Sequence, residues 1–176
     1  MTVRVLLVDD HPVVRAGVRA VLDDESDLEV VGEADSSVCA LELARKLRPD
    51  IIVADFLLPD GDGLTVAEHV RCELPETKVL ILTGVGEESF PLIRAVRAGV
   101  VGYVTKDADT HGLVQIIRSA ASGHVYPCAR TAARLMHEIE SPWRGASKAK
   151  VTSRKLVKCQ DCAGQIWPFQ KREHEL

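Results

Sequence analysis

The chain has 176 residues, 46% of them hydrophobic, enough to bury the core of one domain and carry a further segment. No apolar run approaches the roughly 20 residues of a membrane span, and no signal peptide opens the chain, so we expect a cytoplasmic protein without membrane contact. Residues 141–176 hold eight Lys and Arg against three Asp and Glu, a net charge of +5, which leaves −9 for residues 1–140. The acidic part is a poor candidate for nucleic-acid binding through bulk charge. Five cysteines, an odd number, do not suggest a disulfide framework.

Short apolar runs alternate with segments that have apolar residues at helical spacing. The runs predict five strands, at residues 3–8, 28–34, 51–54, 78–82 and 100–105. The predicted helices begin near His11-Pro12, at Ser36 or Ser37, in the loop after Asp55, between residues 87 and 89, and at Asp109 or Thr110. This alternation predicts an α/β fold, a doubly wound five-stranded parallel sheet with helices on both faces.

The periodic pattern changes after residue 122, where Gly123 ends the last βα unit. Residues 129–140 predict one more amphipathic helix, and from residue 141 onward Pro, Gly, Ser and Lys dominate, which is typical of a linker. We therefore divide the chain into a domain at residues 1–125, a linker helix within 126–140, and a basic tail at 141–176 that we expect to be largely disordered.

Polar side chains follow four of the five predicted strands at the point where each strand ends. Asp9 and Asp10 follow the first, Asp55 the third, Thr83 the fourth and Lys106 the fifth. Alone, each has an ordinary interpretation: the acids can cap turns, and the others can be a surface charge and a strand-end hydroxyl. Because the carboxyl ends of parallel strands meet at one edge of the sheet, we expect these side chains to share a pocket.

Three carboxylates in one pocket repel one another, so they hold a proton or bind a hard divalent cation, and oxygen ligands of this kind suit Mg²⁺. One carboxylate can then act as a nucleophile toward a phosphoryl group. Lys106 would neutralise the transferred oxygens and Thr83 would donate a hydrogen bond to one of them. A dinucleotide-binding fold shares the alternation but needs a Gly-rich turn after its first strand, where this chain has Asp9-Asp10-His11-Pro12.

Four motifs resemble the receiver domain of bacterial two-component response regulators. They are Leu-Leu-Val-Asp-Asp-His-Pro at residues 6–12, Leu-Pro-Asp-Gly-Asp-Gly at 58–63 after Asp55, Leu-Thr-Gly at 82–84 and Gly-Tyr-Val-Thr-Lys-Asp at 102–107. The resemblance covers about residues 1–125 and implies the flavodoxin-like sheet of receivers. The Asp-His-Pro-Val-Val-Arg and Lys106-Asp107 segments are similar to the LuxR/NarL-type branch.

The resemblance assigns roles to residues of this sequence. It implies that Asp55 is the phosphoacceptor, and that Asp9, Asp10 and Asp55 hold Mg²⁺ with the backbone carbonyl of Leu57. Thr83 and Tyr103 would form a switch pair that reshapes the face made by the fourth helix, the fifth strand and the fifth helix. The implied partners are a sensor histidine kinase and a second copy of the receiver. A receiver promotes only its own phosphorylation and dephosphorylation, which distinguishes it from the phosphatase-like enzyme that the same acids also suit.

The tail departs from the LuxR/NarL-type branch, whose members end in a DNA-binding helix-turn-helix domain. Val151-Thr-Ser-Arg154 is similar to the opening of that domain, but residues 155–176 are too few and too irregular to build it. A truncation or reading-frame change after Arg154 explains this economically. We therefore expect no sequence-specific DNA binding. The alternative is a transcriptional regulator whose basic tail still touches DNA. Cys159 and Cys162 with His174 are a weak signal for zinc.

Overall fold

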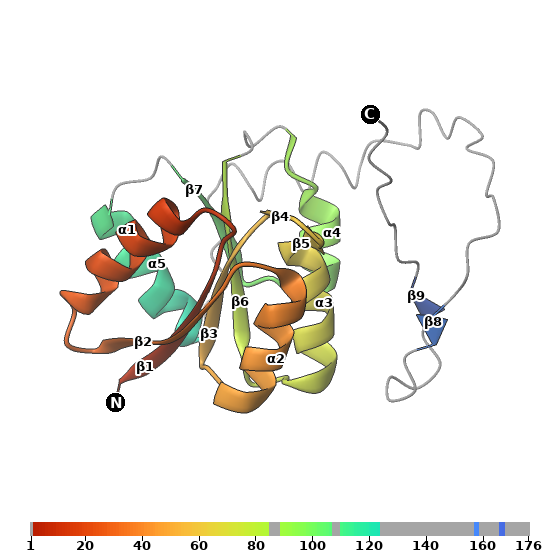
Figure 1. Ribbon diagram of the computed structural model, residues 1–176, viewed down its shortest axis with the longest axis horizontal. Coiled ribbons are helices and arrows are strands. Elements are labelled where there is room, and N and C mark those ends of the chain that lie inside the picture. The colour runs from red at the N-terminus through yellow and green to blue at the C-terminus, as the bar shows by residue number, and fades with distance from the viewer. Residues whose placement is uncertain (1, 85–88, 107–109, 124–156, 159–165, 168–176) are drawn as a thin grey trace.

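The computed structural model describes residues 2–84, 89–106, 110–123, 157–158 and 166–167. Its main sheet is parallel and contains β1 (Val3–Val8), β2 (Leu28–Ala34), β3 (Ile51–Asp55), β6 (Lys78–Thr83) and β7 (Gly102–Thr105). The strands lie in the order β2-β1-β3-β6-β7 (Figure 1). The order reverses between β1 and β3, so the carboxyl ends of these two strands flank the point where sheets of this kind bind ligands.

Five helices cover the two faces of the sheet, and each face has its own core. The helices α1 (Pro12–Asp23) and α5 (Thr110–Ala121) pack on one face, over residues such as Val5, Leu7 and Val53. On the other face lie α2 (Ser37–Leu47), α3 (Gly63–Glu73) and α4 (Leu92–Ala98), over Leu6 and Ile52. The alternation of neighbouring side chains between the two cores follows from the period of two in a strand. The predicted doubly wound fold is confirmed.

Local sequence explains where the elements begin and end. All five residues of β3 are buried, as its continuous apolar run predicts for a central parallel strand. Pro12 occupies the first turn of α1, where its missing amide hydrogen costs nothing. Helix α2 ends at Leu47, and its C-cap Arg48 has a φ of 48° and precedes a proline.

Two predicted boundaries are wrong: the strand predicted at residues 100–105 begins at Gly102, and one helix begins later than predicted. Helix α4 begins at Leu92, after Pro91 as its N-cap, and not near residues 87–89, of which 87 and 88 lie outside the described residues. A proline disfavours helical backbone in the residue before it, so the helix cannot include Phe90. In addition, the loop after β3 contains two short antiparallel strands, β4 (Leu57–Leu58) and β5 (Gly61–Asp62), that periodicity did not indicate.

The C-terminal predictions are largely outside the described residues. This holds for the linker helix at 126–140, for the expected disorder of most of the tail, and for Cys159, Cys162 and His174. Within the tail, β8 (Val157–Lys158) and β9 (Ile166–Trp167) form an antiparallel pair. Among the residues that the structure describes, no helix has the length and apolar character to cross a membrane.

Candidate functional site

The first strand ends at two acids that the following turn holds in place. Asp9 is 4% exposed, whereas Asp10 lies at the surface. The backbone amide of His11 donates a 2.8 Å hydrogen bond to Asp9 Oδ1, and the Arg15 guanidinium donates to the Asp9 carbonyl. Because Pro12 then begins α1, the turn fixes the Asp9 carboxylate at the carboxyl edge of the sheet, with the exposed Asp10 next to it in the chain.

The third strand supplies a second enclosed acid. Asp55 is the last residue of β3, between β1 and β6, and is 4% exposed. The loop then turns back so tightly that a Cβ on Gly63 would overlap the Asp55 carbonyl oxygen and lie 2.9 Å from Ile81 Cδ1. The Leu57 amide lies 3.4 Å from Asp55 Oδ1, a long hydrogen bond. Gly63 therefore allows the close packing that holds Asp55 at this edge.

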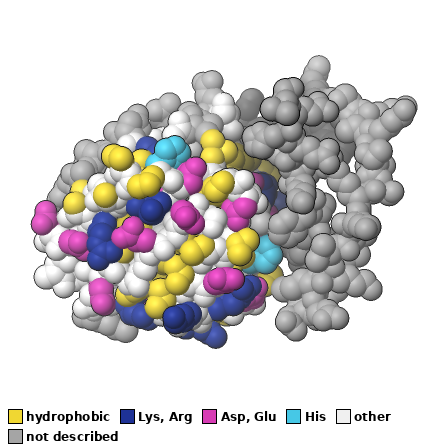
Figure 2. Space-filling view, viewed as in Figure 1, with side chains coloured by type: hydrophobic (Ala, Val, Ile, Leu, Met, Phe, Trp, Pro, Cys, Tyr) yellow, Lys and Arg dark blue, Asp and Glu magenta, His cyan; other side chains and the backbone are white. Residues whose placement is uncertain are grey.

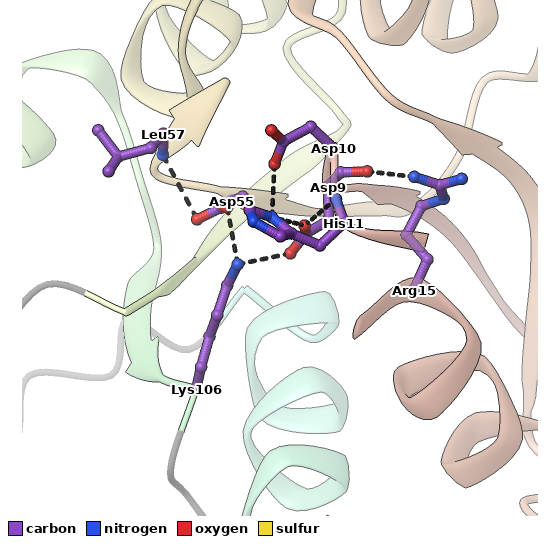
Figure 3. A network of polar contacts seen from close by, with 7 residues as sticks. All are labelled: Asp9, Asp10, His11, Arg15, Asp55, Leu57 and Lys106. Atoms are coloured by element: carbon purple, nitrogen blue, oxygen red, sulfur yellow. Dashed lines mark hydrogen bonds and ion pairs between the residues drawn. The ribbon is translucent and has the colours of Figure 1, made fainter. Parts of the chain in front are cut away.

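A lysine after β7 joins the two buried acids (Figure 3). Lys106 Nζ lies 2.7 Å from Asp55 Oδ2 and 2.7 Å from Asp9 Oδ2. The backbone amide of Lys106 donates a 2.8 Å hydrogen bond to the Thr83 carbonyl, which fixes it beside the end of β6. The predicted convergence of strand-end residues is thus present for one ammonium and two carboxylates.

Burial and charge have opposite effects on the pKa values of Asp55 and Lys106. Burial raises the pKa of the Asp55 carboxyl above its ordinary value, and the nearby Asp9 adds to this, while the Lys106 ammonium acts in the opposite direction without cancelling it. Burial alone would lower the pKa of Lys106, but hydrogen bonding and charge from Asp55 and Asp9 hold it above its usual value. Asp55 is therefore a poorly solvated carboxylate with one cationic partner.

The same edge has the donor set of a divalent-cation site. Asp9, Asp10, His11 and Asp55 each offer one ligand atom, and these atoms all lie within 4.8 Å of one another. Asp9 Oδ2 is buried, and its partner is the Lys106 ammonium 2.7 Å away, which it shares with Asp55. A buried carboxylate is costly unless a cation pairs with it. The residues present fit Mg²⁺, which prefers oxygen ligands.

Of the two predicted switch residues, Thr83 is buried and Tyr103 is partly exposed. Thr83 is fully buried at the end of β6, next to the strand that carries Asp55. Tyr103, in β7, stacks on Phe90 with ring centroids 4.5 Å apart, and Phe90 meets Phe56 edge-on at 5.3 Å. A row of three aromatic rings thus connects the residue after Asp55 with the predicted switch tyrosine. Sequence reasoning missed Phe56 and Phe90.

Three further residues of the site region were also missed. The sequence predicts His11 only as part of a helix start and of the turn after the first strand, although its adjacency to two acids is a usable signal. Asp62 accepts hydrogen bonds from the Thr65 amide at 2.7 Å and from Arg94 Nη1 at 2.6 Å. Asp60 accepts from two backbone amides of α2. These two acids of the Leu-Pro-Asp-Gly-Asp-Gly motif hold the loop in shape and take no part in the cluster.

Comparisons with known proteins agree with this geometry. A family described as "Response regulator receiver domain" matches residues 5–118. The chain is 38% identical over 174 residues to the uncharacterized transcriptional regulatory protein YxjL of Bacillus subtilis (strain 168), which covers 99% of this chain and 73% of that protein.

Solved structures show the same likeness. The signal receiver domain of the response regulator NarL from Mycobacterium tuberculosis is 35% identical, with a TM-score of 0.66 over 70% of this chain and 98% of that one. A LuxR-family two-component response regulator from Aurantimonas sp. SI85-9A1 is also 35% identical, with a TM-score of 0.71 over 80% of this chain and all of that one. The chain therefore belongs to the response regulators of two-component systems, among relatives of the LuxR and NarL type, and residues 5–118 are its receiver domain.

Proposed function

We propose that Asp55 is the phosphoacceptor of this receiver and that Asp9, Asp10 and Asp55, with the Leu57 carbonyl, hold Mg²⁺. The observation that carries this proposal is the bridge made by Lys106, which lies 2.7 Å from both buried carboxylates at the carboxyl edge of the sheet. Bound there, Mg²⁺ would neutralise negative charge on a phosphoryl group.

The side chains have complementary roles in the proposed transfer. A carboxylate oxygen of Asp55 attacks phosphorus and forms an acyl phosphate, while the bond to the donor, a kinase phosphohistidine or a small acyl phosphate, breaks. Poor solvation makes Asp55 a stronger nucleophile than an exposed carboxylate. The Lys106 ammonium then neutralises negative charge on the phosphoryl oxygens, and the Thr83 hydroxyl donates a hydrogen bond to one of them.

The experiment that tests the acceptor is labelling with a small acyl-phosphate donor in the presence of Mg²⁺. Asp55→Asn abolishes acid-labile protein phosphate, because an amide cannot form the acyl phosphate. Asp60→Asn is the matched control: it lies in the same loop, faces α2, and keeps its labelling. Undiminished labelling of Asp55→Asn would contradict the assignment of Asp55 as the phosphoacceptor.

The metal assignment has its own measurement. Asp10→Ala weakens Mg²⁺ binding strongly in titration calorimetry, since a hard cation loses one of its few anionic ligands. Asp10 is exposed, so the variant keeps the fold. Equal Mg²⁺ affinity of the two proteins counts against Asp10 as a ligand.

The proposed output is a change in the α4–β7–α5 face, relayed by Thr83 and Tyr103 and read by protein contacts. Tyr103 packs on Phe90 just before α4, and Phe90 packs on Phe56, the residue after Asp55, so packed rings link the phosphoacceptor loop to this face. In this scheme a sensor histidine kinase supplies the phosphoryl group and a second receiver copy is a candidate partner. The chain promotes only its own phosphorylation and dephosphorylation.

Sequence-specific DNA binding is not part of this proposal. Figure 2 shows acidic and basic side chains interspersed over most of the viewed face of the described domain, with several basic side chains along its lower edge. YxjL is named a transcriptional regulatory protein. The alternative, DNA contact through residues 141–176, predicts salt-sensitive binding that disappears when those residues are removed. A promoter fragment preferred about a thousandfold over random DNA at physiological salt would favour the alternative.

A further inference from the structure

The imidazole of His11 has no role in the proposed phosphoryl transfer, although it lies in the acid cluster. His11 is the N-cap residue of α1, but its side chain makes no capping hydrogen bond. Its backbone amide is held by Asp9 Oδ1, and Pro12 follows it in the first turn of the helix. The backbone of His11 is therefore held in place, while its side chain, which is 65% exposed, is not used for helix capping.

The ring nitrogen points at the carboxylates (Figure 3). His11 Nδ1 lies 2.7 Å from Asp10 Oδ1 and 3.2 Å from Asp9 Oδ1. With the Asp55 oxygen included, all four ligand atoms lie within 4.8 Å of one another. In an octahedron with bonds of about 2.1 Å, adjacent ligand atoms are about 3 Å apart and opposite ones about 4.2 Å. The 4.8 Å limit of the cluster is only slightly wider than this, so one cation can contact the nitrogen and the three oxygens after a small inward shift of the side chains.

We propose that His11 Nδ1 is a ligand of the divalent cation at this edge, and that the receiver therefore binds late transition-metal ions such as Co²⁺, Ni²⁺ and Zn²⁺ as well as Mg²⁺. The proposal rests on the cation site of the proposed function and adds a nitrogen donor to it. Imidazole suits these ions, while carboxylates alone suit Mg²⁺, Ca²⁺ and Mn²⁺.

The competing interpretation is that His11 only forms an ion pair with Asp10 and orients it. The two interpretations predict different changes in metal affinity when the ring is removed. An orienting residue affects every metal that Asp10 binds, so Mg²⁺ and Co²⁺ affinities fall together. A nitrogen ligand affects the ions that favour imidazole, so the Co²⁺ affinity falls while the Mg²⁺ affinity hardly changes.

The test is titration of the unphosphorylated full chain with Co²⁺, followed by its visible absorption spectrum, and separately with Mg²⁺ by calorimetry. The variants are His11→Ala and His11→Asn; the second keeps a residue favoured at helix N-caps while removing the ring. The matched control is His69→Ala, on α3, whose ring nitrogen contacts the Thr65 carbonyl at 2.8 Å and faces no acid of the cluster.

We expect both His11 variants to lose about tenfold or more in Co²⁺ affinity, at least the cost of losing a group that merely supports a metal ligand, with less than about a twofold change for Mg²⁺. Their Co²⁺ spectra change in band position and intensity, and His69→Ala behaves as the parent protein. Equal losses for the two metals, or an unchanged Co²⁺ spectrum, overturn the proposal and leave the Mg²⁺ site standing. A parent chain that binds neither metal overturns the site itself, and with it the proposed function.

Discussion

Two groups of acids lie close together in this domain and are used in opposite ways. In the loop after β3, Asp60 accepts hydrogen bonds from the amides of Ser37 and Val38 at 2.7 and 2.9 Å. Asp62 accepts from Thr65 and pairs with Arg94. Burial alone would raise the pKa of both carboxyls, but these donors outweigh it and hold each pKa below its usual range.

At the edge of the sheet the balance is reversed. Burial raises the pKa of Asp55 despite its ion pair with Lys106, and Asp9 Oδ2 has the same ammonium as its partner, so two buried carboxylates share one lysine. Both groups consist of ordinary aspartates at strand ends and turns. The difference is the supply of donors: a carboxylate whose oxygens are fully used stabilises the fold, and one left short of donors is a place for a cation or a phosphoryl group.

The largest loss of stability is expected at Gly63, which lies between the two groups of acids. Gly63→Ala places a methyl group against the Asp55 carbonyl oxygen and Ile81, and the backbone cannot yield easily there. We expect a loss of about 3 kcal/mol in the free energy of unfolding, measured by urea denaturation. Gly17→Ala is the control: nothing lies within 4 Å of its added Cβ, and in helix α1 it stabilises by about 0.5–1 kcal/mol. Similar behaviour of the two variants would contradict tight packing under Asp55.

The next largest loss of stability is expected when Asp62, which caps α3 and pairs with Arg94, is replaced. Asp62→Ala removes the N-cap of α3 and leaves Arg94 without its closest partner, so we expect a loss of about 2 kcal/mol. Asp62→Asn keeps an oxygen for the Thr65 amide and loses only the charge, so its loss is smaller. Chemical denaturation of the three proteins separates the two contributions, and an equal loss in both variants would assign the whole effect to the ion pair.

The same variant has a defined pH dependence. The folded-state pKa of Asp62 lies below its ordinary value of 3.8, so the folded state disfavours its protonation. The advantage of the parent protein over Asp62→Asn is therefore fully present above pH 3.8 and disappears as the pH falls through the lower folded-state pKa. Denaturation midpoints of the two proteins, followed from neutral to acid pH, measure this difference. An advantage that grows with acid would contradict the assignment.

A smaller effect concerns the start of α2. Asp60→Ala removes both hydrogen bonds to the Ser37 and Val38 amides and is expected to cost about 1 kcal/mol. Ser36→Ala is expected to be nearly neutral, because the Ser36 hydroxyl donates to Asp35 and makes no capping hydrogen bond. Thermal unfolding compares them, and a larger loss for Ser36→Ala would restore the serine cap that the sequence predicted.

This pair of variants also shows what the sequence could reveal. Apolar runs and their spacing were enough to predict the five main strands, the faces covered by helices, and the meeting of Asp9, Asp55 and Lys106, because these depend on local periodicity and on one rule of topology. The cap of α2 depends on Asp60, which is distant in the chain and reaches the helix only after the loop has folded. Local pattern favoured a serine instead.

The role of each acid was equally inaccessible to local pattern. Asp55, Asp60 and Asp62 stand within one short segment and have the same chemistry in the sequence. Which of them is left without enough donors depends on partners from other elements, such as Arg94 of α4 and Lys106 after β7. For the same reason the contact of His11 with the acids, and the row of rings that ends at Tyr103, became visible only in the fold.

The smallest predicted change in stability is a gain and not a loss. In the metal-free protein Asp55→Asn is expected to stabilise the fold by somewhat less than about 1 kcal/mol, because it removes a charge that burial disfavours while Lys106 keeps Asp9 as a partner. The folded-state pKa of Asp55 is raised above 3.8, so the parent protein is at no disadvantage below that pH and reaches its full disadvantage above the raised pKa. Urea denaturation in the presence of a chelator, from acid to neutral pH, should show the gap widening with pH. Added Mg²⁺ should then reverse the order, since only the parent has its full set of carboxylates to bind the ion. Destabilisation of Asp55→Asn at neutral pH without metal would mean that Asp55, like Asp62, has all the donors it needs.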